Sequence, residues 1–170
     1  CAAWLDGTTA TEREIERWLG FLVERGVAAL NIIPDRNWNI ADPETRRTKV
    51  ANLHHVVEVA RALDLPLNVG TEMNSFGQKE VDTFDAPALA PVRQAFLDGA
   101  HFIYGHTALA RARDQGYQSE WARQHLPTRR ERNDFYTRLG YALPPGRQAQ
   151  ARLRALPPGL APQEIMSSIG

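Results

Sequence analysis

The chain has little of several features on which whole classes of protein depend. It contains one cysteine in 170 residues, which excludes an internal disulfide framework and a cysteine-rich zinc module. Neither charge is in excess, since 20 Lys and Arg residues balance 20 Asp and Glu residues. This removes the general electrostatic argument for binding nucleic acid or an anionic membrane surface. Purely apolar runs span only a few residues, whereas a membrane-spanning helix needs roughly 20.

The apolar residues that are present are sufficient for a core. They make up 43% of a chain whose length favours one domain. The composition is typical of a globular protein from a reducing compartment, and we expect the cytoplasm. The chain opens on Cys1, with no initiator Met and no signal-like segment after it. We therefore expect the later part of a longer polypeptide. A lipid-acceptor cysteine of a processed lipoprotein and an N-terminal nucleophile are the alternatives.

Helical and strand patterns alternate along the chain. Thr11 and Glu14 match a capping box, and apolar residues at helical spacing then continue up to Gly26. The following patterns predict strands at 27–35, 67–74 and 101–107 and helices at 44–63, 89–97, 108–124 and 129–143. Alternation of helix and strand at a spacing of about 35 residues predicts parallel βα units.

The predicted fold class is therefore α/β with parallel βα units. Three parallel strands cannot close a barrel, and they leave two sheet edges open. A small open α/β sandwich and the C-terminal part of a (β/α)₈ barrel both fit, and we favour the barrel. The βα-repeat domain would occupy residues 1–143, and a Pro- and Arg-rich tail that is loosely ordered or wraps the surface would occupy residues 144–170. We expect the missing N-terminal half of the barrel, or another chain, to cover the open edges.

Ionisable side chains follow each of the three predicted strands. The first strand ends at Asp35, the second at Glu72 and the third at His106. Active sites of parallel α/β proteins lie at these carboxyl ends. Two carboxylates and an imidazole can hold a divalent metal (Zn²⁺, Mn²⁺ or Mg²⁺), and they can also act as a general acid and base without one. We therefore predict these three residues as catalytic groups and metal ligands.

Polar residues beside these strand ends are candidates for substrate binding. Arg36 could clamp a carboxylate or phosphate, and Trp38 could stack on a ring. The predicted substrate contacts are Arg36, Asn37, Trp38, Asn74 and Gln78. The polar loop 74–80 is placed to act as a lid, and the charged residues in and after it, Lys79, Asp82 and Asp85, are expected to be solvated or capping. Asn31 and Asn68 would face inward with the site or, alternatively, hydrogen-bond to each other across neighbouring strands.

The strand ends NIIPDRNWN, NVGTEMN and YGHT resemble the C-terminal part of TIM-barrel metal-dependent hydrolases. The similar groups are the amidohydrolase superfamily and the polymerase-and-histidinol-phosphatase barrels, and the resemblance covers about residues 27 to 110. It implies a metal-activated water that cleaves an amide, ester or phosphoester bond. It also implies strand-end ligand roles for Glu72 and His106 and, by a looser match, for Asp35.

Three functional hypotheses follow. The leading one is a metal-dependent hydrolase of a small polar substrate. The second is a barrel enzyme that isomerises or cleaves a sugar with a bound metal. The third is a catalytically silent barrel that binds a small ligand or a partner protein. None of the three involves a nucleic acid or a membrane span.

Overall fold

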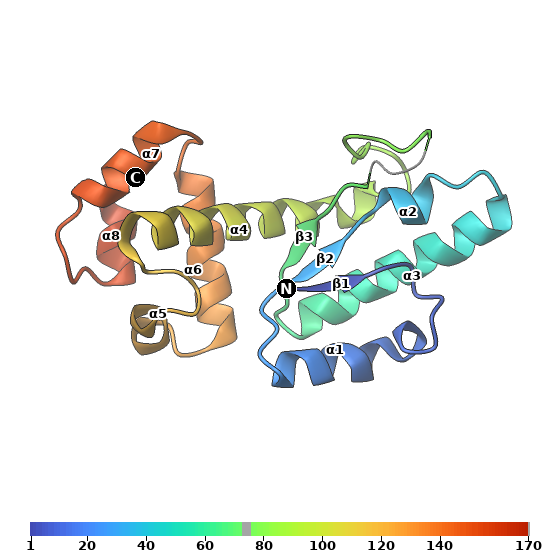
Figure 1. Cartoon of the computed structure of the whole chain (residues 1–170), viewed down its shortest axis with the longest axis horizontal. Helices are drawn as coiled ribbons and strands as arrows, with labels where there is room; N and C mark the ends of the chain where they lie inside the picture. The colour runs from blue at the N-terminus through green and yellow to red at the C-terminus, as the bar shows by residue number, and fades with distance from the viewer. Residues whose placement is uncertain (73–75, 170) are drawn as a thin grey trace. The chain divides into compact units, whose positions relative to one another are not determined.

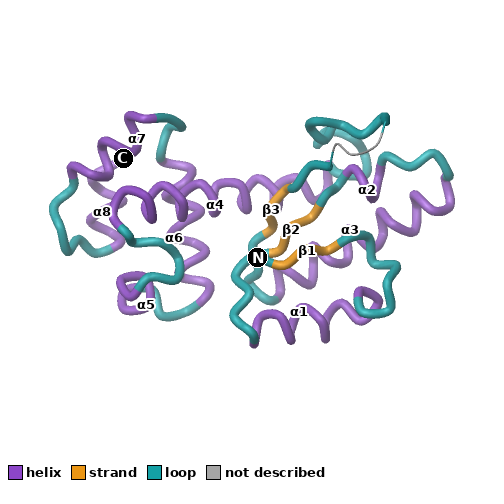
Figure 2. The backbone as a smooth tube through the Cα atoms, viewed as in Figure 1, coloured by secondary structure: helices purple, strands orange, loops and turns teal. Residues whose placement is uncertain are grey.

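The computed structural model describes residues 1–72 and 76–169 (Figure 1). The chain divides into two compact units, Cys1–Leu97 and Asp98–Gly170, and helix α4 (Arg93–Arg113) contains the boundary. The first unit is α/β, and the second has only helices among its described residues (Figure 2). Within the described residues, no helix combines the length and the apolar character that crossing a bilayer requires.

Unit 1 is built on a parallel three-stranded sheet. Its strands are β1 (Ala2–Trp4), β2 (Leu30–Ile32) and β3 (Leu67–Val69), in the order β1-β2-β3. The register aligns Leu30 with Leu67 and Asn31 with Asn68. The α/β prediction is confirmed, and β2 and β3 lie where the sequence places strands. No sequence pattern predicts β1, which lies at the start of the chain.

Two helical crossovers connect the strands. The first consists of the 3₁₀ turn η1 (Glu12–Glu14) and helix α1 (Ile15–Glu24), and the second consists of the short helix α2 (Asp35–Trp38) and helix α3 (Pro43–Ala62). After β3, the 3₁₀ turn η2 (Ala90–Val92) leads into α4. The Asp42 side chain caps α3 by accepting from the Thr45 N–H, as a helix start requires. Thr11 makes no such bond, and Thr9 accepts from the Glu12 N–H instead, so the predicted capping box is wrong.

The core of unit 1 lies on one face of the sheet. That face carries Leu30, Ile32 and Leu67, which pack with the buried sides of α1 and α3. The two helices also contact each other (Figure 1). Because side chains alternate along a strand, Asn31 and Asn68 point to the opposite face. One face is therefore apolar and covered by helices, and the other carries amides.

The described residues of unit 2, 98–169, form the later part of α4 and four further helices. These are α5 (Glu120–His125), α6 (Arg129–Ala142), α7 (Arg147–Ala155) and α8 (Pro162–Ile169). The predicted strand 101–107 is wrong, since these residues form the middle of α4. Phe102 and Leu109 are buried two helical turns apart, and Gly105 between them lets the α6 backbone approach. The predicted helix 129–143 is confirmed as α6.

The segment 144–170 differs from the loosely ordered tail that the sequence suggested. It contains α7 and α8, which bury Ala149, Leu153 and Ile165. Arg113, near the end of α4, donates hydrogen bonds to the carbonyl oxygens of Leu153, Leu156 and Pro157. The segment is therefore fastened to α4 by charge-assisted bonds to the C-terminal end of α7.

Candidate functional site

The carboxyl ends of the three strands bring polar side chains together in unit 1. We call this region the carboxyl edge, and it comprises residues 5–8 after β1, 33–38 after β2 and 70–72 after β3. Pro34 turns the chain from β2 directly into the one-turn helix α2, which starts at Asp35. The edge therefore presents Asp35 and Arg36 next to the end of the neighbouring strand β3.

Asp35 is buried at this edge. Its carboxylate Oδ1 has no hydrogen-bond partner among the described residues. A buried carboxylate oxygen without a partner costs free energy, so its presence needs an explanation. One explanation is that a substrate or water normally donates to it.

Asp82 lies close enough to Asp35 for the two carboxyl groups to interact. Burial, and secondarily the negative charge of Asp35, raise the pKa of Asp82, and a hydrogen bond of 2.8 Å from the Trp38 Nε1–H opposes the rise. The expectation that Asp82 is solvated or capping is wrong, because only 7% of this residue is exposed. The residue sits in a long loop with no sequence motif, so no local signal identifies it.

Arg36 and Glu72 form an ion pair across β2 and β3. One guanidinium nitrogen, Nη1, donates to both carboxylate oxygens, at 3.1 and 3.0 Å. The two predicted site residues are therefore brought together as expected, but they bind each other. An anion at Nη1 of Arg36 would therefore have to displace the Glu72 carboxylate.

The side chains of Asn37 and Trp38 fix the architecture of the edge. Asn37 is fully buried and donates from Nδ2 to the carbonyl oxygens of Leu5 and Ile33, which ties the ends of β1 and β2 together. Trp38 binds Asp82, and the Lys79 ammonium lies 5.1 Å from the centre of the Trp38 ring. The loop after residue 75 is thereby anchored on α2.

Two further residues, Gln78 and Asn74, are also predicted to contact the substrate. Gln78 is partly exposed within this same loop. Asn74 lies outside the described residues.

His106 belongs to unit 2 and follows no strand. It sits in α4 within unit 2, where its Nδ1 accepts a hydrogen bond of 2.9 Å from the Tyr117 backbone N–H. Burial lowers the pKa of its imidazole. The prediction that His106 ends a strand is wrong, because the segment is helical, and its ring serves to hold the chain after α4.

Asn31 and Asn68 lie on the face of the sheet opposite the core, and their side-chain amides form a hydrogen-bonded pair. Asn68 Nδ2 donates to Asn31 Oδ1 at 2.8 Å, so the alternative that these amides bond to each other is confirmed. A Cβ on Gly70 would lie 2.7 Å from the Asn31 Nδ2, so the glycine leaves room for this amide.

At the end of β1, Asp6 is likewise paired, with the Lys49 ammonium at 2.8 Å. Burial raises the pKa of Asp6, but the bonds from Lys49 and Thr8 outweigh burial and hold the pKa below its ordinary value.

The donor set at the edge does not form a ready metal site. Within residues 1–72 and 76–169, no group of three His, Cys, Asp or Glu side chains could hold a metal ion. Both oxygens of Glu72 accept from Arg36, and the predicted third ligand, His106, is a helical residue of unit 2. A metal requirement therefore stays a prediction, to be tested by metal content.

Comparison with protein-family models, with curated proteins and with solved structures found no match to this chain.

Proposed function

We propose that the carboxyl edge of unit 1 binds a small polar substrate and hydrolyses an amide, ester or phosphoester bond in it. The observation that carries the proposal is the buried Asp35 carboxylate, which has an unpaired Oδ1 and interacts with the carboxyl group of Asp82. A buried carboxylate beside a carboxyl group whose pKa is raised is a usual basis for acid–base catalysis.

The surroundings of Asp35 and Asp82 indicate which of them would act as the base and which as the acid. Asp82 keeps its proton to a higher pH than an ordinary carboxyl, because it is buried and faces the charge of Asp35. Asp35 would act as the base and take a proton from water while the water oxygen bonds to the substrate carbon or phosphorus. Asp82 would give its proton to the leaving group as the scissile bond breaks. Arg36 would orient an anionic part of the substrate in exchange for Glu72.

Metal dependence belongs to this proposal as a separate prediction. The test is elemental analysis of protein purified without chelators, comparing the natural chain with Glu72→Gln. Near-stoichiometric Zn, Mn or Mg that falls in the variant would support it. No step of the acid–base scheme depends on the outcome.

The sheet supports part of a (β/α)₈ barrel as the wider fold. Both crossover helices pack on one face, and the amide pair of Asn31 and Asn68 lies on the other, where a barrel interior would be. Sedimentation equilibrium tests this inference, because the open edge of β1 should promote association with another chain. The single cysteine supports a reducing compartment, the cytoplasm.

A catalytically silent binding module is the second candidate. The observation that favours it is the mutual pairing of Arg36 with Glu72 and of Asn31 with Asn68, since groups satisfied by each other are not poised for chemistry.

The decisive experiment compares hydrolysis of p-nitrophenyl acetate, p-nitrophenyl phosphate and an amino-acid p-nitroanilide, with and without added Mn²⁺ or Zn²⁺. Asp35→Asn and Asp82→Asn should each lower turnover by about 100- to 10,000-fold, the usual contribution of a general acid or base. Asp85→Asn is the matched control, because Asp85 is exposed and pairs with Arg93 at the surface. Equal rates in Asp35→Asn and the natural chain would refute the acid–base proposal. No turnover of any compound would favour the silent binding module.

A further inference from the structure

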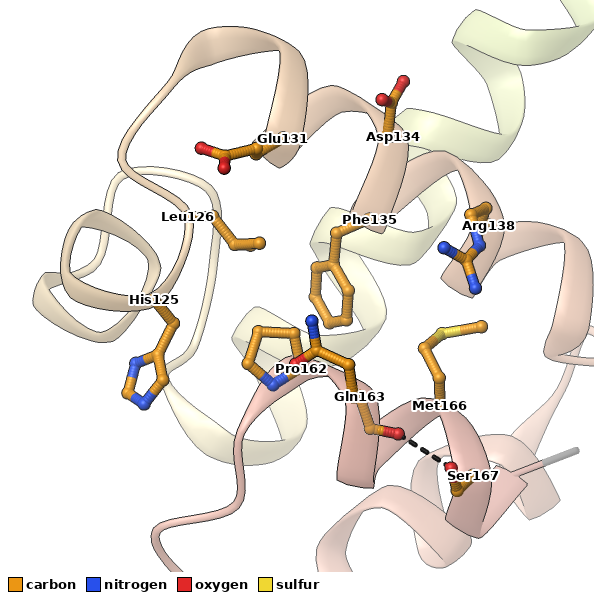
Figure 3. A pocket seen from close by; sticks show the side chains of 10 residues that line it. All are labelled: His125, Leu126, Glu131, Asp134, Phe135, Arg138, Pro162, Gln163, Met166 and Ser167. Atoms are coloured by element: carbon orange, nitrogen blue, oxygen red, sulfur yellow. Dashed lines mark hydrogen bonds between the residues drawn. The ribbon is translucent and has the colours of Figure 1, made fainter.

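Unit 2 contains an open pocket of about 470 Å³ among α5, α6 and α8 (Figure 3). Its volume lies within the range of small-molecule sites in proteins. The apolar part of its wall comes from four side chains, Leu126, Phe135, Pro162 and Met166.

The apolar wall is held in place by aromatic packing. The Phe135 ring lies with its centre 5.7 Å from that of Trp121 and 5.0 Å from that of Tyr136. Phe135, Leu126 and Pro162 are buried, and Met166 is partly exposed. The wall is therefore a fixed apolar surface with one adaptable thioether side chain.

Arg138, an exposed residue of α6, supplies a cation at the rim of this pocket. Within the described part of the chain its guanidinium has no ion pair. Figure 3 shows the guanidinium turned toward Met166, whereas the Asp134 carboxylate one helical turn earlier points away from the pocket. An unpaired guanidinium beside an apolar wall is suited to a carboxylate carried on an apolar body.

Two other polar side chains at the rim, Glu131 and His125, already make hydrogen bonds within the protein. The Glu131 Oε2 accepts from the N–H and the hydroxyl of Thr128, at 2.8 and 2.7 Å. Because a carbonyl oxygen only accepts, His125 Nδ1 must donate to the Trp121 carbonyl, at 3.0 Å. In the neutral ring Nε2 is then an acceptor. The Glu131 carboxylate at the rim would repel a second negative charge on the ligand.

We propose that this pocket binds a small monocarboxylate with an apolar body, whose carboxylate pairs with Arg138 and whose body lies against Phe135 and Met166. This site is in unit 2 and is independent of the hydrolytic site proposed for the carboxyl edge. The ligand class is set by one guanidinium, an apolar wall and an acidic rim.

Titration of the full chain with octanoate, octanol and octylamine, followed by calorimetry or NMR, tests the proposal. Octanoate should bind about tenfold more tightly than octanol, since octanol lacks the charge-assisted bonds to the guanidinium. Arg138→Gln should weaken octanoate binding by about tenfold and leave octanol binding unchanged. Arg147→Gln on α7 is the matched control, because Arg147 is exposed and does not line the pocket.

A second variant tests the same contact from the other side. Met166→Glu should place a carboxylate beside Arg138 and abolish octanoate binding, while circular dichroism confirms that the helices are retained. Three results would each overturn the proposal: no binding of octanoate, tighter binding of octylamine than of octanoate, or unchanged octanoate affinity in Arg138→Gln. Failure here would leave the hydrolysis assays on Asp35 unaffected, because those assays read unit 1.

Discussion

Helices α4 and α6 cross at two glycines, and alanine at Gly140 should force them apart. A Cβ on Gly140 would meet the carbonyl oxygen of His101, closer than real Cβ atoms come to any neighbour. A Cβ on Gly105 would meet the carbonyl oxygen of Tyr136 in the same way. The obstacle is backbone in both cases, so no side-chain rotation can relieve it.

The magnitude follows from two opposing effects. Alanine stabilises a helix interior by about 1 kcal/mol relative to glycine. Overpacking costs about 1–3 kcal/mol, and more where the backbone must move. Separating the helices also weakens the contact between Phe102 and Tyr136, whose ring centres lie 6.4 Å apart. We therefore expect Gly140→Ala to lower the free energy of unfolding of unit 2 by about 2 kcal/mol, a fall in midpoint of roughly 10 °C for a unit of this size.

The assay is thermal and urea unfolding, with the amide NMR signals of α6 reporting on unit 2. Gly20→Ala provides the control, since Gly20 lies within α1 and a Cβ there would meet nothing within 4 Å. That control should gain about 0.5–1 kcal/mol from helix propensity alone. If Gly140→Ala unfolds at or above the midpoint of the natural chain, the close crossing of α4 and α6 is refuted.

Two further predictions concern charge. The lowered pKa of His106 means that folded unit 2 prefers the neutral ring, so its contribution to stability is present at and above pH 7 and is lost as pH falls below the unfolded value of about 6.5. Unfolding midpoints measured from pH 7.5 to 5 should fall less steeply in His106→Asn, whose Oδ1 can still accept from the Tyr117 N–H, and an identical slope would contradict this. Asp35→Asn should raise the stability of unit 1 by about 1 kcal/mol while it lowers activity, because it removes a buried charge that faces Asp82. A destabilised variant would show that Asp35 has a structural partner.

The elements that the sequence predicts correctly are those with local signals. Helix α3 begins at a capping Asp42 followed by proline, and it buries Leu53 and Val57 at helical spacing. The short helix α1 is followed by Gly26 with φ of +86°, which only glycine adopts without strain. Each of these signals lies within a few residues of the boundary that it defines.

The segment 101–107 shows where local reasoning fails. Its apolar and aromatic residues are typical of a strand, and a glycine within a helix normally weakens it. The helix is stabilised instead by close packing on Gly140, about 35 residues later in the chain, which no local pattern reveals. Because the segment is helical, His106 lies within α4 and not at the strand end where the pattern predicts it.

For the candidate site, the sequence predicts which residues lie at the strand ends but not which side chains pair with each other. Parallel strands place their carboxyl ends at one edge, so Asp35 and Glu72 lie at the same edge, as the strand pattern predicts. The salt bridge from Arg36 to Glu72 and the burial of Asp82 depend on how long loops pack, and sequence spacing carries no information about that.

The polar groups at the carboxyl edge of unit 1 fall into two kinds, and the difference supports the choice of Asp35 as the proposed base. The amides of Asn31 and Asn68 bond to each other, and Glu72 is bound by Arg36, so these groups hold the sheet together. The Oδ1 atoms of Asp35 and Asn37 are buried without a partner among the described residues, although they belong to a single turn of helix. Natural proteins tolerate such unsatisfied groups mainly where function requires them. Both atoms are hydrogen-bond acceptors, and in the proposed hydrolysis the attacking water would donate to Asp35.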